Sequence, residues 1–585
     1  MSAACLKIKN RLSRLTLTGL TVLFIVLASP KDTRTMNRSN VETELQVPPI
    51  GLRSLPRKQV MLTFAGVMLA MFLSSLDQTI VGTAMPRIIS DLGGFSHYTW
   101  VTTAYIIASA AVIPITGKLT DMYGRKFFYL GGLGIFVLAS FLCGLSNTMT
   151  QIIIFRGIQG IGAGVMMANS FAVIGDIFPP AERGKYQGFM SGVFGLSSII
   201  GPTLGGYITD TLSWHWVFFI NIPLGLAIIL LFIFFFPNFR PDNLKHSIDY
   251  PGLVLLILTV VPAMLALSWG GVEYGWGSPQ IIGMFLFSAV MLALFVFAEL
   301  RSREPIIPLS LFRNRIVAIS ELVIFFTAFG MFGGIIFVPL FFQGVLGVTA
   351  TTSGSFLTPM MLGMVIGSFA SGQMLSRAGG HYRLQGIIGL VVMGTGLGLL
   401  SRMTIETSYI NAVVNIILVG LGLGITMPLY TIAVQNAVPY NVLGVATSST
   451  AFFRSLGGSV GLAIFGSVMN NRFATELMGR LPPAIKALIP PQQLEALAHN
   501  PQALVSPEAQ NQLQGLLGQM GPQGAALSQQ VLQAMRQSLD VALSQVFLFA
   551  MLAVVVAFLI NLFIKEVPLR RYHTFDPVTP ERKIK

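Results

Sequence analysis

Long apolar runs, separated by short polar segments, repeat along almost the whole chain. A helix needs roughly 20 apolar residues to cross about 30 Å of hydrocarbon, and about fourteen runs have that length. The predicted membrane helices cover residues 62–86, 98–117, 127–146, 151–175, 187–209, 215–236, 251–270, 279–299, 315–343, 352–375, 385–403, 409–435, 442–469 and 543–564. An even number of helices returns the chain to the side where it started. We therefore predict an all-α protein that crosses the membrane many times.

The composition supports a location in lipid. Of the 585 residues, 53% are hydrophobic and only 10% are charged, and the mean hydropathy is +0.72, whereas roughly a quarter of a soluble protein is charged. The net charge of +14 comes from short basic blocks between apolar runs. These blocks lack the stripe of bases and stacking aromatics that binds nucleic acid. The two cysteines, Cys5 and Cys143, and the six scattered histidines have no metal-ligand spacing, so we predict neither a disulfide framework nor a metal site.

Lysine and arginine gather in one set of short loops and in the C-terminal tail. These bases are Lys118, Arg125, Lys126, Arg183, Lys185, Arg240, Lys245, Arg301, Arg303, Arg313, Arg315, Arg377, Arg383, Arg570, Arg571 and Lys585. The short loops on the other side hold little beyond Arg87 and Arg402. Because bases accumulate on the cytoplasmic side, both termini are predicted to be cytoplasmic.

Polar segments divide the chain. We predict a cytoplasmic leader 1–57, an N-terminal six-helix bundle 58–236, a linker 237–314 with two extra helices, a C-terminal six-helix bundle 315–564 and a cytoplasmic tail 565–585. Within the leader, Met36 begins a polar stretch, and we favour it as the start over a cleaved signal peptide or an extra helix. Residues 470–541 form a hydrophilic segment rich in Gln, Pro and Ala, which the helix count puts outside. We expect it to be partly helical, because LSQQVLQAMRQSLD has helical periodicity.

The stretch GKLTDMYGRKFF, from Gly117 to Phe128, concentrates charge in an otherwise apolar chain. Gly117 and Gly124 permit a tight turn between the second and third helices, and Asp121 lies four residues before Arg125. An ordinary basic cytoplasmic loop explains the bases, but it explains neither the glycines nor the acid.

A degraded copy of this stretch occurs much later, as GQMLSRAGGHYR from Gly372 to Arg383. Gly372 and Gly379 repeat the glycine spacing, but Ser376 stands where the first copy has its aspartate. The copy also joins two predicted helices on the cytoplasmic side. Internal repetition of membrane halves is typical of transporters.

In these residues the chain resembles the major facilitator superfamily, and within it the 14-helix drug:proton antiporters. The charged stretch resembles the family's G-x-L-x-D-x-x-G-R-K loop. Four further stretches resemble antiporter signatures in order along the first half: LDQTIVGTAMPRI (76–88), RGIQGIGAG (156–164), SSIIGPTLGG (197–206) and WHWVFFINIPLG (214–225). His215 departs from the last signature, where the family commonly has arginine.

The resemblance implies two six-helix bundles, with two inserted helices, that work by alternating access. It also implies that the charged loop is a conformational switch that holds one state closed without touching substrate. The switch residues are Gly117, Asp121, Gly124, Arg125 and Lys126. In the fifth helix, the resemblance associates the antiporter motif with restricted leakage and export direction. Its residues are Gly201, Pro202, Gly205 and Gly206, which let a helix bend and approach a neighbour closely.

Charged side chains inside the hydrocarbon are costly and usually functional. Asp77 on the first helix and Arg156 on the fourth lie within about one helical turn of the same depth, so they are able to pair. The resemblance implies that the acid binds a proton or a cation and that the arginine influences its proton affinity. A static buried ion pair that joins the two helices is the alternative.

Two further charges lie in the second half of the chain. Glu321 lies near the cytoplasmic end of the ninth helix, where it lines a cavity, extends to the surface or pairs with Arg315. Arg454 lies deeper, inside the thirteenth helix, and is predicted to line the cavity. With Asp77 and Arg156, both residues are predicted to take part in proton coupling or substrate binding. Further cavity candidates are Trp100, Gln159 and Asn221. The alternatives are an interfacial anchor for the tryptophan and helix-to-helix hydrogen bonds for the amides.

No P-loop pattern occurs in the chain, so we expect an ion gradient, and not ATP, to supply the energy. The resemblance implies that the coupling ion is the proton, and we expect no cofactor. The expected function is proton-coupled multidrug efflux of lipophilic, often cationic, compounds across a bacterial cell membrane. The expected partners are lipid, substrates and protons, without nucleic acid, and the expected state is a monomer. A second hypothesis is an exporter of one metabolite, such as a siderophore, amino acid or lipid precursor. A membrane receptor or intramembrane enzyme is disfavoured, because no catalytic constellation occurs.

Overall fold

The computed structural model describes residues 56–92, 98–237, 247–271, 273–347, 357–378, 381–481, 485–486 and 522–569. The expectations for Met36, for most of the leader and for most of the tail lie outside these residues.

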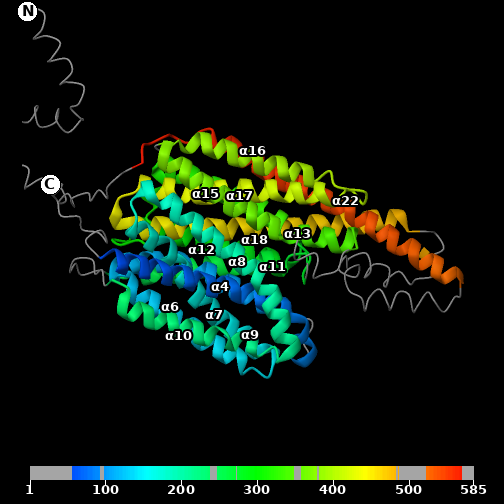
Figure 1. Cartoon of the computed structure of the whole chain (residues 1–585), viewed down its shortest axis with the longest axis horizontal. Coiled ribbons are helices and arrows are strands. Elements are labelled where there is room, and N and C mark those ends of the chain that lie inside the picture. The colour runs from blue at the N-terminus through cyan, green and yellow to red at the C-terminus, as the bar shows by residue number, and fades with distance from the viewer. Residues whose placement is uncertain are drawn as a thin grey trace, which may run out of the picture. The chain divides into compact units, whose positions relative to one another are not determined.

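Helices account for nearly all of the described chain (Figure 1). They are α4 (Arg57–Leu92), α5 (Tyr98–Tyr123), α6 (Arg125–Gly144), α7 (Met149–Ile177), α8 (Pro180–Thr211), α9 (Trp216–Phe219), α10 (Asn221–Phe235), α11 (Tyr250–Trp269), α12 (Pro279–Arg301), α13 (Arg315–Leu340), α15 (Leu357–Ala378), α16 (Tyr382–Leu400), α17 (Tyr409–Ala437), α18 (Leu443–Arg480) and α22 (Pro522–Asn561). Short 3₁₀ segments at Leu309–Arg313 and Tyr440–Val442 precede α13 and α18, and a π-helical turn at Phe341–Val345 follows α13.

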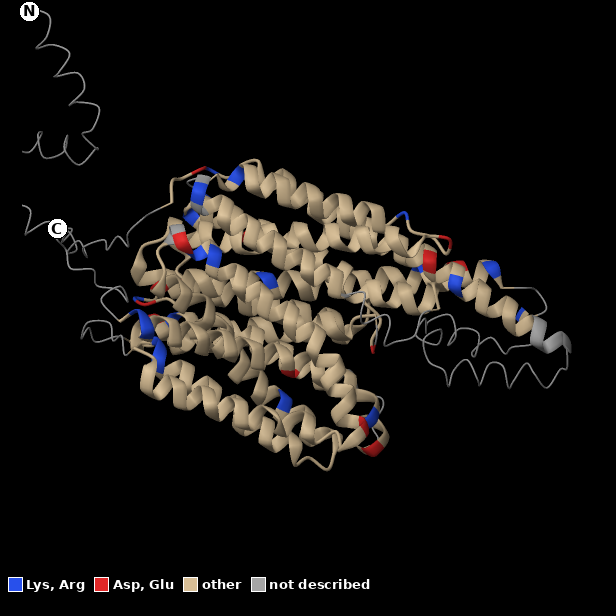
Figure 2. Ribbon diagram, in the orientation of Figure 1, with Lys and Arg blue, Asp and Glu red and all other residues tan. Residues whose placement is uncertain are grey.

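Each predicted apolar run corresponds to a helix, with α9 and α10 together forming the sixth. Of the described helical segments, 13 are long and apolar enough to cross a membrane. Figure 2 shows most charged positions near the ends of the helices and few along their middle. Large apolar side chains such as Leu286 and Phe297 on α12 are exposed, as expected for helix faces that contact lipid. Helices suit this surrounding, because their backbone hydrogen bonds are satisfied within each helix. The predicted all-α membrane fold is confirmed.

The two halves of the chain repeat one packing pattern. In the N-terminal half (α4–α10), α7 packs closely on α5, and a Cβ added to Gly164 would lie 2.6 Å from the carbonyl oxygen of Ser109. In the C-terminal half (α13–α22), α17 packs on α15 in the same way, and a Cβ on Gly420 would overlap the backbone of Met360. The second and fourth helices of each half therefore approach each other through small residues, as membrane helices commonly do.

The inserted segment that carries α11 and α12 contacts both halves, and α11 itself packs on α5 and on α18. The rings of Trp269 on α11 and Trp100 on α5 lie 5.0 Å apart. In the loop that follows, the indole Nε1 of Trp276 donates to the hydroxyl of Ser467 on α18 at 3.1 Å. After α12, Glu304 forms an ion pair with Lys118 of the charged stretch at 3.5 Å. The inserted pair thus packs along the line where α5 and α18 meet.

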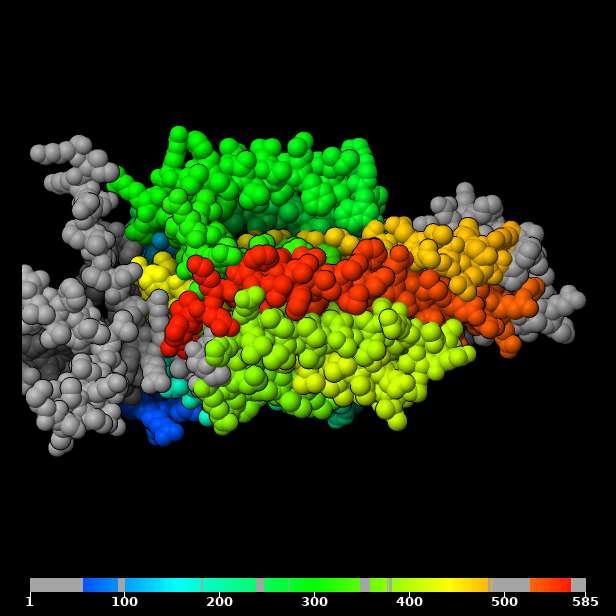
Figure 3. Space-filling model, turned by 90° about the horizontal axis from the view of Figure 1, so that it is seen from above, coloured from blue at the N-terminus to red at the C-terminus, as the bar shows by residue number. Residues whose placement is uncertain are grey.

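The predicted hydrophilic segment 470–541 begins and ends in helix. Helix α18 continues to Arg480, and α22 begins at Pro522, so both helices are longer than the apolar runs that predicted them. The helical periodicity of Leu527–Asp540 is confirmed. Figure 3 shows α22, in red, beside the yellow-green α16, with which it packs. That this segment lies outside the cell remains a prediction.

Candidate functional site

A buried polar network surrounds Asp77 on α4. The Asp77 side chain is fully buried, and its Oδ2 accepts from Nη1 of Arg156 on α7 at 2.5 Å. Its Oδ1 accepts from Nε2 of Gln159, also on α7, at 2.9 Å and from Nδ2 of Asn221 on α10 at 2.8 Å. A buried carboxylate is stable as an anion only when it is paired and hydrogen-bonded, and Asp77 has both kinds of partner.

The network extends beyond the carboxylate. Arg156 also donates to Oε1 of Gln159 at 2.8 Å and to the carbonyl oxygen of Val101 at 3.4 Å, and its guanidinium carbon lies 4.2 Å from the ring centre of Tyr105. Asn221 donates to the hydroxyl of Ser140 at 2.9 Å. Four helices of the N-terminal half, α4, α6, α7 and α10, therefore meet at this network, and α5 contributes Val101 and Tyr105.

The structure brings together four of the residues singled out from the sequence, namely Asp77, Arg156, Gln159 and Asn221. The side chain of Trp100, the remaining cavity candidate of this half, packs on the inserted helix α11 through Trp269. Depth along the helices predicted the pairing of the acid with the arginine, but it gave no signal for Ser140 or Tyr105.

The antiporter motif on α8 packs against the same helix as Asp77. A Cβ on Gly201 or Gly205 would overlap the hydroxyl of Thr79 or Thr83 on α4, respectively. Thr79 also donates to the carbonyl oxygen of Ser197 on α8 at 3.1 Å. The expectation of a close approach is wrong for Gly206, where an added Cβ would meet nothing within 4 Å. The reason is helical geometry, since adjacent residues on a helix face different directions.

The charged stretch is helical where the sequence suggested a loop. Helix α5 continues through Tyr123, and the only interruption before α6 is Gly124, whose φ of 92° lies in the left-handed region that favours glycine. Gly117 does not form the expected turn. It allows a close contact between helices, because a Cβ there would overlap the hydroxyl of Ser448 on α18. Gly117 is therefore required for helix-to-helix contact between the two halves.

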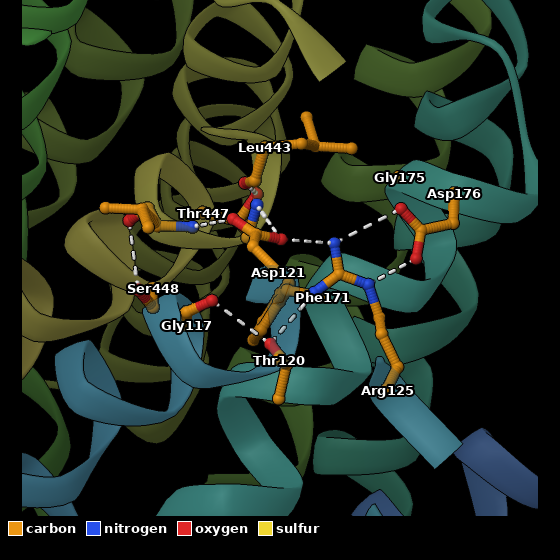
Figure 4. Close-up of polar contacts among 12 residues, drawn as sticks. Gly117, Thr120, Asp121, Arg125, Phe171, Gly175, Asp176, Leu443, Thr447 and Ser448 are labelled. Carbon is orange, nitrogen blue, oxygen red and sulfur yellow. Dashed lines mark hydrogen bonds and ion pairs between the residues drawn. The ribbon is translucent and has the colours of Figure 1, made fainter. Parts of the chain in front are cut away.

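Asp121 lies against the N-terminus of α18 (Figure 4). Its Oδ1 accepts from the backbone N–H of Gly444 at 3.1 Å, and its Oδ2 accepts from that of Val445 at 2.9 Å. Arg125 donates to the same carboxylate at 2.9 Å. The N-terminus of a helix has unpaired N–H groups and a partial positive charge, so it stabilises an anion from another helix.

A second acid, Asp176 near the end of α7, completes this charged cluster (Figure 4). Nε of Arg125 donates to Oδ2 of Asp176, and its Nη1 donates to the hydroxyl of Thr120 at 3.0 Å. Sequence reasoning missed Asp176, because it lies one residue beyond the predicted span, where charges are ordinary. We call Asp121, Arg125 and Asp176 the charged cluster. Lys126, by contrast, donates to the carbonyl oxygen of Ile233 on α10 at 2.8 Å, within its own half.

A second contact joins the halves at the same end of the helices. A Cβ on Gly184 of α8 would lie 2.6 Å from the Cα of Gly372 on α15. Gly372 is the first glycine of the degraded copy, so the first glycines of both copies contact the opposite half. Farther along the same pair of helices, the hydroxyls of Ser191 and Ser368 lie 2.9 Å apart.

Polar contacts around Arg183 on α8 also join the two halves. Arg183 is buried and donates to the carbonyl oxygens of Phe178 at 2.8 Å and Gly175 at 2.5 Å and to Oε1 of Gln435 on α17 at 3.2 Å. Gln435 in turn donates to the carbonyl oxygen of Phe171 on α7 at 3.3 Å. The helix ends that carry the charged cluster are therefore joined across the two halves in this conformation.

The predicted acid and base of the C-terminal half are both buried. Glu321 on α13 is 1% exposed, which excludes an extension of its side chain to the surface. Arg315, the partner considered for it from the sequence, is exposed. Arg454 on α18 donates to the hydroxyl of Thr431 at 3.3 Å and lies 5.6 Å from the ring centre of Phe171 in the other half. The Glu321 carboxylate interacts electrostatically with Arg454 and with the hydroxyl of Ser449.

Comparison with known proteins places this architecture in a family. Residues 67–462 match the family model of the Major Facilitator Superfamily. The chain is 41% identical over 526 residues to the multidrug transporter protein MdtP of Bacillus subtilis, covering 90% of this chain and 96% of that protein. It is 42% identical over 417 residues to multidrug resistance protein 3 of the same organism, covering 70% of this chain and 80% of that protein.

More distant relatives include a rubrofusarin-specific efflux pump of Gibberella zeae. That protein is 33% identical over 417 residues, which cover 70% of this chain and 76% of the pump. Among solved structures, the human organic anion transporter MFSD10 matches with a TM-score of 0.54 and 14% identity, covering 85% of this chain and all of that chain. At this identity the structural match shows the fold alone.

Proposed function

Since the chain belongs to the Major Facilitator Superfamily, we propose that it exports lipophilic, often cationic, compounds in exchange for protons. That the chain is a membrane transporter of the efflux type follows from its relatives. The proton as coupling ion, and the breadth and charge of the substrates, are the proposal.

The observation that carries the proposal is the fully buried Asp77 with its three donors. A carboxylate inside hydrocarbon is expensive, so an acid retained there indicates a proton or cation pathway. When Arg156 moves away as the helices rearrange, the carboxylate loses its main counter-charge and takes up a proton or a cationic substrate. Competition between these two cations for one carboxylate gives antiport.

In this proposal, the charged cluster acts as a conformational switch. Asp121 bonds to α18 of the other half only while the halves meet at these helix ends. We assign these ends to the cytoplasmic side, because the bases of the short loops gather there. The described conformation is then closed to the cytoplasm, and breaking the Asp121 contact opens the path by which substrate enters.

The experiment that tests the proposal is ethidium uptake into inverted membrane vesicles with an acid interior. Uptake that depends on the gradient and stops when an uncoupler collapses it supports proton-coupled drug antiport. No gradient-dependent uptake, with the protein folded and inserted, contradicts the proposal. Vesicles that contain Asp77→Asn serve as the matched control.

A narrow-substrate exporter is the second candidate, and a relative favours it. The pump of Gibberella zeae is named for one compound, rubrofusarin. A metabolite screen in the same vesicles separates the two candidates, because a narrow exporter transports one compound and leaves ethidium outside.

The remaining expectations belong to the proposal. We propose a monomer in a bacterial cell membrane, with both termini in the cytoplasm, that uses no cofactor and does not bind nucleic acid. Its partners are lipid, protons and the exported compounds.

A further inference from the structure

Glu321 lies in an unusual environment for a glutamate. Neither of its carboxylate oxygens has a hydrogen-bond partner at normal distance, and the side chain is 1% exposed. The hydroxyl of Ser449 on α18, which faces it, also lacks a partner at normal distance. A buried acid with so little hydrogen bonding requires an explanation, because native proteins leave few buried polar groups unsatisfied.

The charged and titratable groups around Glu321 are few. Arg454 on α18 is the described charged group whose field acts on it. Arg454 makes its hydrogen bond to Thr431 on α17, not to Glu321. The nearest titratable group on α17, Tyr430, lies beside Arg454 in a small pocket and donates to Asn561 of α22 at 3.0 Å. None of these groups gives the Glu321 carboxylate a direct donor.

Asp77 and Glu321 therefore differ in chemistry. Asp77 has three direct donors, one of them a guanidinium, and such donors stabilise a negative charge. An ionised Glu321 would be buried with only the hydroxyl of Ser449 beside it and no donor at normal hydrogen-bond distance, which is far more costly than burial of the neutral acid. The described conformation thus suits a charged Asp77 and a protonated Glu321.

We propose that Glu321 is a second proton-binding site, on the first helix of the C-terminal half, and that it exchanges its proton when the charged-cluster end opens. This inference rests on the proposed function, since it names where a coupled proton is held. The two acids lie at different depths. Asp77 is about 30 Å along α4 from its start, and Glu321 is only about 9 Å along α13 from its start.

Helix α18 links this site to the charged cluster. The backbone N–H groups that bind Asp121 belong to Gly444 and Val445, and Ser449 and Arg454 follow on the same helix. When the Asp121 contact breaks and α18 moves, water reaches Glu321 from that end. The O–H bond of the acid then breaks, the proton passes to water, and the carboxylate that remains is stabilised by Arg454. Return of α18 excludes water from this end, so the proton that neutralises the carboxylate again has to come from the opposite end of the helices.

The test compares Glu321→Gln with Glu299→Gln and with the unchanged protein. Glutamine has the shape of the protonated acid but holds no exchangeable proton. Glu299 on α12 is also a buried acid, but it accepts from the backbone N–H of Ile306 at 3.1 Å and lies in the inserted pair. Each protein is reconstituted, and gradient-driven ethidium uptake is measured beside ethidium counterflow without a gradient. Proton release on ethidium addition is followed in detergent with a pH indicator.

For Glu321→Gln we expect loss of gradient-driven uptake and reduced proton release, with counterflow kept within about twofold of the unchanged protein. Glu299→Gln is expected to behave as the unchanged protein does. If Glu321→Gln keeps both gradient-driven uptake and full proton release, the inference is overturned while the proposed function stands. If the unchanged protein itself shows no gradient-driven uptake, the proposed function fails first.

Glu321→Asp gives a second test if the glutamine variant does not fold. A shorter acid at the same place holds a proton in altered surroundings. We expect the pH profile of its counterflow to be displaced from that of the unchanged protein. If the two pH profiles of counterflow coincide, the proposal that this residue binds a proton is contradicted.

Discussion

At the residue scale, the proposed coupling of transport to protons depends on Asp77. We predict that Asp77→Asn abolishes gradient-driven export and leaves the protein folded. Removing one partner of a buried ion pair costs about 3–5 kcal/mol when the other charge is left alone. Here Arg156 keeps Gln159, the carbonyl oxygen of Val101 and the ring of Tyr105. We therefore expect a lower melting temperature but a normal yield, measured by fluorescence-detected gel filtration with heating, beside vesicle uptake.

Gln159→Ala is the informative comparison for this prediction. It removes one neutral donor from Asp77 and leaves the charge pair, so gradient-driven uptake is expected to be weakened and not abolished. Unchanged export in Asp77→Asn would remove this carboxylate from the coupling mechanism.

Asp121 is predicted to act on turnover more than on binding. Asparagine at this position loses the ion pair with Arg125 and keeps one carbonyl oxygen for the N-terminus of α18. The conformation in which the halves meet at this end is thereby destabilised. We expect turnover in vesicles to fall about tenfold, which corresponds to about 1.4 kcal/mol. Ethidium affinity in detergent is expected to change less than turnover, and an equal loss of both would place Asp121 in substrate binding.

Part of the site could be predicted from single residues. Asp77 and Arg156 stood out because charge is rare in apolar runs, and the helical rise gave both nearly the same depth. Glu321 remained open between surface and cavity, because its distance from the helix end allowed both. Asp176 had no signal at all. Its position at a helix end is ordinary, and only the fold shows that Arg125 bonds to it.

At the element scale, small residues determine how closely helices of opposite halves approach. We predict that Gly184→Ala disfavours the described conformation, because the added Cβ would lie 2.6 Å from the Cα of Gly372. Forced overpacking of this kind typically costs about 1–3 kcal/mol. The measurement is the rate at which a cysteine introduced at Ser191 reacts with a water-soluble maleimide. We expect that rate to rise about 5- to 30-fold, which corresponds to the lower part of this range, about 1–2 kcal/mol.

Gly134→Ala on α6 is the matched control, because an added Cβ there meets nothing within 4 Å. Its labelling rate is expected to equal that of the background protein. Equal labelling in the Gly184 and Gly134 variants would show that this glycine contact does not determine access.

Gly117 shows where local sequence stops being informative. The pattern of two glycines around an acid is compatible with a turn, yet Gly117 is helical. Its need for a hydrogen side chain comes from Ser448, 331 positions later in the chain. Helix number and order could be predicted, because the hydrophobic requirement of a membrane helix is local. Which glycine faces a partner helix depends on packing between the two halves, and this packing cannot be predicted from a short stretch of sequence.

At the scale of the whole molecule, the two junctions are related by the internal repeat. In one, the second helix of the N-terminal half (α5) meets the fifth of the C-terminal half (α18). In the other, the second helix of the C-terminal half (α15) meets the fifth of the N-terminal half (α8). The charged cluster strengthens only the first junction, since the degraded copy has Ser376 in place of an aspartate. In the proposed mechanism both junctions separate when this end opens, so fixing either one is expected to prevent transport.

The last prediction follows from that requirement. The hydroxyls of Ser191 and Ser368 lie 2.9 Å apart across the second junction, so cysteines there are close enough for a disulfide of about 2.05 Å. We expect the oxidised Ser191→Cys, Ser368→Cys protein to lose ethidium uptake in proportion to its cross-linked fraction, and to regain it on reduction. The Ser191→Cys and Ser368→Cys single variants under the same oxidant are the controls, because each of them keeps the native Cys5 and the buried Cys143. Full transport by a protein that is completely cross-linked would mean that the two halves do not separate here, and alternating access would then require movement within one half.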